Sequence, residues 1–142
     1  FIQPLTLQVL SQNTVHLDVM HEPFPDQVNH IQIGKETDLF IVVPATANTI
    51  AKLAHGFADN MVTATALALP HFVPKLLAPA MNTKMYDHSA TQANLKTLED
   101  YGYTIISPKD SLLACGDIGR GALADLERIL QQIKDKLHEQ TL

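Results

Sequence analysis

Two segments hold most of the residues whose types suggest chemistry. Residues 44–49 (PATANT) follow the apolar run 39–43, and residues 78–85 (APAMNTKM) follow a second short apolar run. Each segment combines proline, small side chains and an asparagine, Asn48 or Asn82, whose amide both donates and accepts hydrogen bonds without a charge. Either segment alone could simply end a strand and begin a helix. Together they predict a site for a flat uncharged ring system or a carboxylate.

A cysteine and a histidine are further candidates. Cys115, the single cysteine, precedes the glycine-rich residues 116–121, which match neither the Walker loop nor the dinucleotide fingerprint. We interpret 108–125 as a flexible loop that carries a thiol, the alternative being a small buried apolar side chain. By spacing alone His30 is a packing residue, with catalysis as the alternative. The seven histidines show no convincing metal-ligand spacing, so no metal is expected.

The hydrophobic pattern alternates strands with helices. Strands are predicted at 39–43, 75–78 and 103–107, with a weaker one at 14–19, and helices at 4–11, 28–38, 48–69 (interrupted at Gly56), 89–102 (capping box Ser89 to Gln92, stop at Gly102) and after Asp125. This order implies a parallel sheet with helices on both faces. Because parallel strands end at the same edge, segments 44–49 and 78–85 are expected to meet there.

Length and composition bound the class of protein. The 142 residues suit one domain, 1–142, with a modest core. A net charge of −5 without a basic run argues against a nucleic-acid partner. No apolar run reaches the roughly 18 residues of a membrane span, so no membrane partner is expected. One cysteine excludes an internal disulfide framework and suits a reducing, cytoplasmic compartment.

Four segments, in this order, resemble the homo-oligomeric flavin-containing cysteine decarboxylases. They are NHI at 29–31, PATANT at 44–49, PAMNTKM at 79–85 and LACGDIGRG at 113–121. The last resembles the flap of one branch, the phosphopantothenoylcysteine decarboxylases of coenzyme A biosynthesis, in their stand-alone bacterial form. The resemblance runs over nearly the whole chain.

The resemblance implies a flavodoxin-like, Rossmann-like α/β fold, a three-layer doubly wound parallel sheet whose first strand and helix would precede Phe1. It also implies FMN as cofactor, bound at a subunit interface of a homotrimer or homododecamer. The cofactor-binding residues would be Pro44, Ala45, Thr46, Ala47, Asn48, Thr49 and Ala80.

The implied reaction is decarboxylation of 4′-phosphopantothenoyl-L-cysteine to 4′-phosphopantetheine, by way of a thioaldehyde, loss of CO2 and reduction of the resulting ene-thiolate. His30 would be the acid–base residue and Cys115 the final proton donor. Asn82 would hold the substrate carboxylate, with Met85 and Ala114 as further substrate contacts. Arg120 or Lys84 would meet the phosphate.

Three alternatives remain open at this point. A decarboxylase of peptide C-terminal cysteines is disfavoured by Cys115, because the family members of that branch that are known to us lack this cysteine. A non-catalytic, flavin-binding regulatory subunit is disfavoured by the C-terminal KDKLHEQTL, which is neither long nor strongly acidic. A flavin prenyltransferase is disfavoured by the segments at 78–85 and 113–121.

Overall fold

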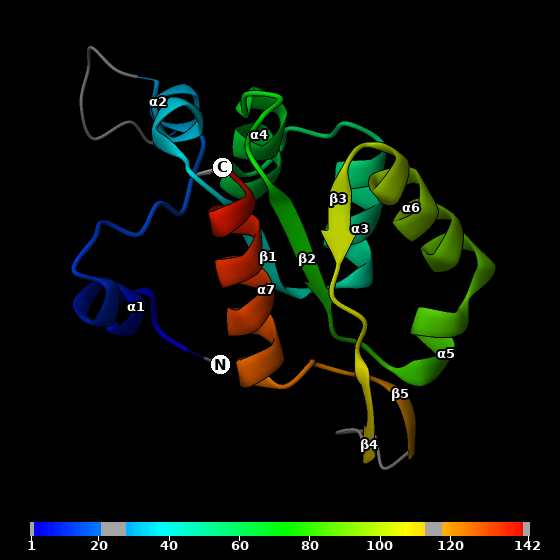
Figure 1. The fold of residues 1–142 in the computed structure, drawn as a ribbon. Helices are drawn as coiled ribbons and strands as arrows, with labels where there is room; N and C mark the ends of the chain where they lie inside the picture. Colours follow the sequence, from blue (N-terminus) through cyan, green and yellow to red (C-terminus); the bar gives the residue numbers. More distant parts are fainter. Residues whose placement is uncertain (1, 21–27, 113–117, 141–142) are drawn as a thin grey trace.

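A short parallel sheet organises the protein. The computed structural model describes residues 2–20, 28–112 and 118–140. Strands β1 (Phe40–Ala45), β2 (Lys75–Pro79) and β3 (Tyr103–Ile105) lie side by side in that order, all parallel (Figure 1). The three strands predicted for this sheet are thereby confirmed, although β1 extends through Pro44 to Ala45 and β3 ends early.

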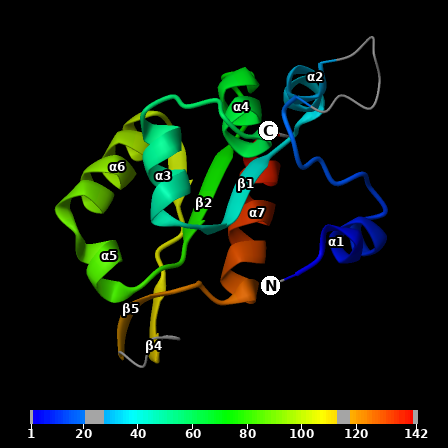
Figure 2. The same cartoon turned by 180° about the vertical axis from the view of Figure 1, so that it is seen from behind.

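Helices cover both faces of the sheet, as predicted. Helix α7 (Leu126–Gln140) packs on one face, and α3 (Ala47–Ala54) and α6 (Ser89–Asp100) pack on the other (Figures 1 and 2). Successive side chains of a strand point to opposite faces. Leu76 and Ala78 therefore join the α7 side of the core, whereas Leu77 joins the α3 and α6 side. The fold is a three-layer α/β arrangement.

The remaining elements lie at the two ends of the sheet. Helices α2 (Asn29–Glu36) and α4 (Met61–Ala68) lie at the end where β2 begins. They pack so closely that a Cβ on Gly34 would lie 2.9 Å from the carbonyl oxygen of Ala68. Helix α5 (Thr83–Asp87) and the antiparallel strands β4 (Lys109–Leu112) and β5 (Ile118–Ala122) lie at the opposite end, where β2 finishes (Figure 1).

The helical segment predicted over 48–69 is interrupted at Gly56, as expected, but the interruption separates two helices, α3 and α4, so one long helix is wrong. Gly56 ends α3 with a φ of +70°, and a Cβ there would meet nothing within 4 Å, so this glycine serves a backbone conformation and not close packing. Asn60 then starts α4: its side chain accepts from the Thr63 amide, and the Thr63 hydroxyl accepts from the Asn60 amide. Apolar spacing alone does not register such a reciprocal cap.

Two further local predictions are wrong. Residues 14–19 form no strand. The predicted capping box of α6 is absent, because His88 caps this helix by accepting from the Ala90 amide. The Gln92 side chain reaches instead to the carbonyl of Tyr86. Gly102, with a φ of +87°, follows the end of α6 as predicted.

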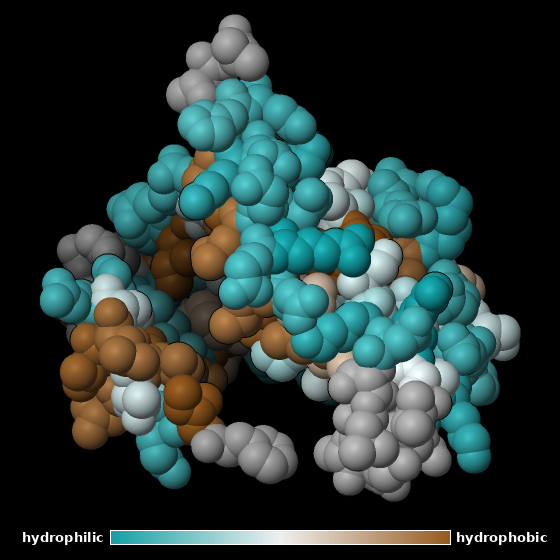
Figure 3. All heavy atoms as spheres, turned by 60° about the horizontal axis from the view of Figure 1, so that its bottom comes forward, coloured by the Kyte–Doolittle hydropathy of each residue, from teal (hydrophilic) through white to brown (hydrophobic). Residues whose placement is uncertain are grey.

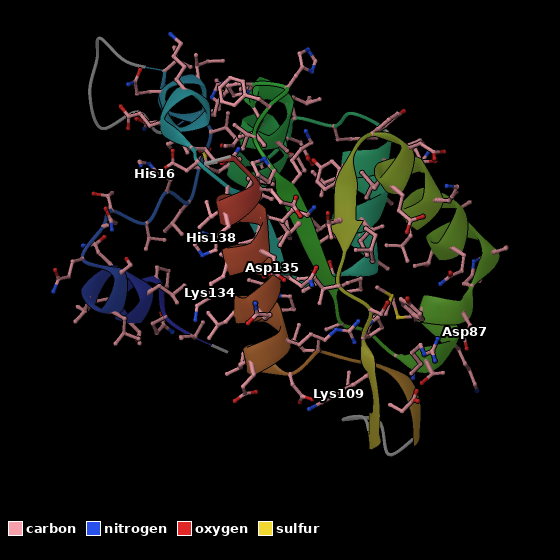
Figure 4. The ribbon with its side chains drawn as sticks, viewed as in Figure 1. His16, Asp87, Lys109, Lys134, Asp135 and His138 are labelled. Carbon is pink, nitrogen blue, oxygen red and sulfur yellow. The ribbon has the colours of Figure 1, made fainter. Side chains whose placement is uncertain are left out.

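The flexible loop predicted over 108–125 is wrong for residues 109–112 and 118–122, which form the β4–β5 ribbon. Asp125 does precede the last helix, as predicted: its carbonyl accepts from the Ile129 amide. Its carboxylate pairs with Lys109 at the start of β4, beside the first turn of α7 (Figure 4). This pair ties the base of the ribbon to α7.

Helix α1 (Pro4–Ser11) forms where predicted but buries none of its residues. Leu5, Val9 and Leu10 are all at least two-thirds exposed, and Figure 3 shows a hydrophobic surface over this helix. Within the described ranges, no helix is long and apolar enough to cross a membrane.

Tyr103, the first residue of β3, gives the protein a testable dependence on alkaline pH. Burial raises the pKa of its phenol from 10.0 to about 12. As the pH rises the unfolded chain loses this proton first, so the stabilisation present below about pH 10 is lost between roughly pH 10 and 12. We expect the free energy of unfolding to fall by on the order of 2 kcal/mol across that window from this group.

Denaturant unfolding at each pH measures this fall. Tyr103→Phe removes the titrating hydroxyl and should flatten the curve, whereas the matched control Tyr101→Phe, at an exposed tyrosine, should retain it. Identical pH curves for the two variants would contradict the assignment.

Candidate active site

The structure joins the segments 44–49 and 78–85, hereafter the strand-end segments. Ala45 is paired in register with Pro79, and the Ala80 amide donates to the Ala45 carbonyl at 3.0 Å. This bond extends the contact between β1 and β2 beyond the last strand pair. The expectation that the two segments meet at one edge of the sheet is confirmed.

The first strand-end segment presents uncharged polar groups at the beginning of α3. Thr46 is the N-cap, and its hydroxyl accepts from the Thr49 amide at 3.3 Å. Ala45 is fully buried in the core, whereas Pro44 and Asn48 are exposed. The side chain of Asn48 makes no hydrogen bond with any other described residue. A helix N-terminus flanked by an exposed amide and small side chains suits a polar, uncharged ligand edge.

The second strand-end segment positions Asn82. This residue caps α5: its Oδ1 accepts from the Lys84 amide at 2.9 Å, and its carbonyl accepts from the Tyr86 amide. The cap uses the acceptor half of the amide, so the donor half, Nδ2, lies on the other side of the group. Ala80 and Asn82 are half-buried, and Met85 is half-exposed.

Strand β5 lies directly against this second segment. The Met81 amide donates to the Gly121 carbonyl at 2.9 Å. A Cβ on Gly121 would lie 2.2 Å from the Met81 carbonyl oxygen, and one on Gly119 would lie 2.7 Å from Oγ1 of Thr83. The glycines therefore permit close approach to the strand-end site and are not signs of a loop. The sequence did carry one signal of a strand here. The two glycines are two residues apart, so they lie on the same face of a strand.

Cys115 and Ala114 lie outside the described residues, in the segment 113–117 that connects the two strands of the ribbon. The flanking residues Leu112 and Ile118 are paired, as the last residue of β4 and the first residue of β5. The roles of both residues stay predictions.

His30 is not brought to the strand-end segments within one copy of the chain. It lies in the first turn of α2, at the end of the sheet opposite α5 and the ribbon (Figure 1). Its half-buried ring lines a small pocket against Ala64 and Leu67 of α4. Nδ1 of this ring is buried and has no hydrogen-bond partner among the described residues. Such an atom is available to a ligand or to a second copy of the chain.

Two basic side chains lie on the strand-end side. Arg120 is exposed, with Nε 3.8 Å from Oδ1 of Asp110. Lys84, two residues after Asn82, is exposed and forms no ion pair within the described ranges. Nowhere in those ranges do three histidine, cysteine, aspartate or glutamate side chains gather as a metal site needs.

Comparisons with known proteins decide the family. The model of the family described as "Flavoprotein" matches residues 1–138. The chain belongs to the flavoprotein family. This flavoprotein is 60% identical over 137 residues to a probable phosphopantothenoylcysteine decarboxylase of Streptococcus mutans, covering 96% of this chain and 76% of that protein.

Other relatives point the same way. The coenzyme A biosynthesis bifunctional protein CoaBC of Bacillus subtilis is 44% identical over 141 residues, which are 99% of this chain and 34% of that protein. The flavoprotein thus spans about a third of the length of this bifunctional relative.

Solved structures confirm the flavodoxin-like fold. One is a cysteine-to-serine mutant of PPC decarboxylase complexed with pantothenoylaminoethenethiol, with a TM-score of 0.79 and 34% identity, covering 85% of this chain and 69% of that one. Another is the FMN-dependent cysteine decarboxylase SpaF, with a TM-score of 0.81 and 30% identity, covering 100% of this chain and 74% of that one. The flavoprotein therefore has the doubly wound fold that its sequence predicts.

Proposed function

We propose that this flavoprotein is a carboxy-lyase of coenzyme A biosynthesis, the FMN-dependent decarboxylase that converts 4′-phosphopantothenoyl-L-cysteine to 4′-phosphopantetheine. The observation that carries the proposal is the junction of the strand-end segments by the Ala80–Ala45 hydrogen bond, with β5 held against Met81. The names of the Streptococcus and Bacillus relatives support this substrate and pathway. Residues 1–142 would act as one flavoprotein domain.

The described residues fit FMN. The segment 44–49 has no charged side chain, and the exposed Pro44 and Asn48 flank the amides of the first turn of α3. Ala47 and Ala80 are half-buried and small enough for a flat ring to approach the backbone. The residues that would hold it are Pro44 to Thr49 and Ala80. When bound, FMN supplies the hydride acceptor that oxidises the thiol-bearing carbon of the substrate.

Asn82 would orient the substrate carboxylate through its Nδ2 donor. An uncharged donor positions the carboxylate without the strong ground-state stabilisation that a lysine or arginine would give. Since that negative charge disappears as CO2 leaves, a cation bound to it would oppose the reaction. Arg120 or Lys84, both exposed on this side of the sheet, would attract the substrate phosphate.

His30 and Cys115 would handle the protons. A cysteine amide has no group that can accept the electron pair released with CO2; oxidation to a thioaldehyde creates one β to the carboxylate. His30 would act as the acid–base residue of the oxidation and decarboxylation. Cys115 would give a proton to the ene-thiolate as it is reduced. A thiol in that role must stay reduced, so we expect a cytoplasmic location.

We further propose that the site is completed between copies of the chain in a homotrimer or homododecamer. Helix α2, which carries His30, lies at the far end of the sheet from the strand-end segments. An acid–base residue must come within hydrogen-bond reach of the proton it moves. A second copy can supply His30, and the exposed apolar side of α1 offers a surface for such an association.

The exact mass of the product tests the reaction. With FMN and phosphopantothenoylcysteine, we expect a product lighter by CO2 alone. With Cys115→Ser, we expect a product lighter by CO2 and two further hydrogens, because the ene-thiolate is no longer protonated and reduced. A cysteine-to-serine mutant of PPC decarboxylase in complex with an ethenethiol supports this expectation.

Each other outcome is decisive. Release of the more oxidised product by the unaltered protein would favour the peptide decarboxylase, and FMN binding without reaction would favour the regulatory subunit. Normal phosphopantetheine from the Cys115→Ser variant would remove that residue from the mechanism.

A further inference from the structure

A second cavity lies at the end of the sheet opposite the strand-end segments. Its volume is about 600 Å³, which is within the usual range for small-molecule sites. It is bounded by the end of α3, by α4 and by the first residues of β2 and β3. The lining residues are Leu53, Ala54, His55, Gly56, Phe57, Thr63, Ala66, Leu67, Leu69, His71, Lys75, Tyr101 and Tyr103.

This cavity, hereafter the α3–α4 cavity, is separate from the strand-end segments of the same copy of the chain. Lys75 begins β2, whereas Pro79 ends it beside the first strand-end segment. At about 3.3 Å per residue, the strand places roughly 13 Å between these two residues. A ligand bound at the strand-end segments of one copy therefore does not occupy the α3–α4 cavity of that copy.

The charge of the α3–α4 cavity is one-sided. No aspartate or glutamate in the described part of the chain lines it. Lys75 is half-buried and makes no ion pair with any described carboxylate; its Nζ lies 5.8 Å from the centre of the Tyr103 ring. A half-buried ammonium that makes no ion pair retains most of its capacity to attract an anion.

The other polar groups of the cavity suit the same ligand. The Nδ1 of His55 lies 2.8 Å from the Ala51 carbonyl, which can only accept, so Nδ1 carries a proton and Nε2 remains for a ligand. The phenol of Tyr103 is protonated at neutral pH, as an ordinary tyrosine is, so its hydroxyl can donate a hydrogen bond. Phe57 and Tyr101, both more than half exposed, add aromatic surface to the wall.

We propose that the α3–α4 cavity binds a small aromatic anion, whose carboxylate, sulfonate or phosphate group meets Lys75 and whose flat body packs among Phe57, Leu67 and Tyr101. The combination of aromatic walls, one cation and no carboxylate selects this class against cations and against fully polar metabolites.

The probe for the test is 8-anilinonaphthalene-1-sulfonate, followed by its fluorescence with the complete protein and FMN. We expect saturable binding at one site per chain. Naphthalene-2-carboxylate should displace it, whereas naphthalene-2-carboxamide, of the same shape without the charge, should not. Lys75→Gln should weaken binding about tenfold, because one close charge pair is lost. Lys134→Gln, on the side of α7 away from β2 and β3, should leave it unchanged (Figure 4).

A second pair of variants keeps the test decisive if Lys75→Gln perturbs folding. Leu67 lines the cavity and is 59% exposed, so Leu67→Glu can fold while placing a repelling carboxylate at the site. Leu130 on α7 is 56% exposed and outside the cavity, so Leu130→Glu is the matched control. Equal binding by Leu67→Glu and the unaltered protein, or equal losses in Leu67→Glu and Leu130→Glu, would overturn the proposal.

Discussion

Replacing Gly121 by alanine is expected to lower turnover by at least about a hundredfold, because misplacing a covering element by about 1 Å already has effects of this size. The new Cβ would lie 2.2 Å from the carbonyl oxygen of Met81, a backbone atom that cannot rotate away. The same residue accepts the hydrogen bond from the Met81 amide. Relief of the contact therefore requires β5 to move away from the second strand-end segment. The rest of the β4–β5 ribbon, whose two strands are joined by the segment that contains Cys115, would move with it.

The stability of this variant should fall by about 1–3 kcal/mol, the usual cost of overpacking. Steady-state turnover and thermal unfolding measure the two effects. Gly56→Ala is the matched control: Gly56 has a φ of +70°, but a Cβ there would meet nothing within 4 Å. It should lose about 1 kcal/mol through backbone strain and keep its turnover. Normal turnover in Gly121→Ala would show that the contact between β5 and Met81 is dispensable.

Replacing His30 by asparagine is expected to reduce turnover by about 10²- to 10⁴-fold, the usual contribution of an acid–base residue. FMN binding, followed by flavin absorbance, should be retained, because the residues proposed to hold FMN, 44–49 and Ala80, are unchanged in this variant. Loss of FMN together with turnover would instead indicate a general disturbance of the fold. Turnover at the level of the unaltered protein would exclude His30 from the chemistry.

Mixed oligomers test where His30 acts. Asn82→Asp keeps an oxygen that can cap α5 but replaces the amide donor with a charge that repels the substrate carboxylate, so it should also be inactive. If each site combines His30 of one copy with Asn82 of another, co-expression of the two inactive variants restores about a quarter of the sites in a cyclic oligomer. If both residues act within one copy, co-expression restores nothing.

Part of the fold and of the candidate site could be predicted from the sequence because their signals are local. The runs 39–43 and 75–78 are short, continuous and apolar, which is typical of parallel strands buried on both faces. Pro44 and Pro79, together with small residues and Asn48 or Asn82, then mark the strand ends. The rule that such ends share one edge was enough to place these segments together.

The β4–β5 ribbon could not be predicted in the same way. Gly119 and Gly121 have no side chain whose hydrophobicity reports a strand, and glycine is most often found in turns. Their role becomes visible only when the backbone of Met81 and the side chain of Thr83 are seen within contact distance. The interruption at Gly56 was predicted, but the separate start of α4 was not, because the Asn60–Thr63 cap competes with an otherwise helical pattern.

The sequence by itself determined the order of strands and helices, the two strand-end segments and the resemblance of its motifs to a flavin-dependent family, because each depends on residue types close together along the chain. Only the tertiary structure decided that β5 lies on Met81, that His30 is remote from Asn82 within one copy, and that Lys75 faces a cavity without a carboxylate. These relations join residues tens of positions apart, and their proximity depends on how the helices pack around the sheet.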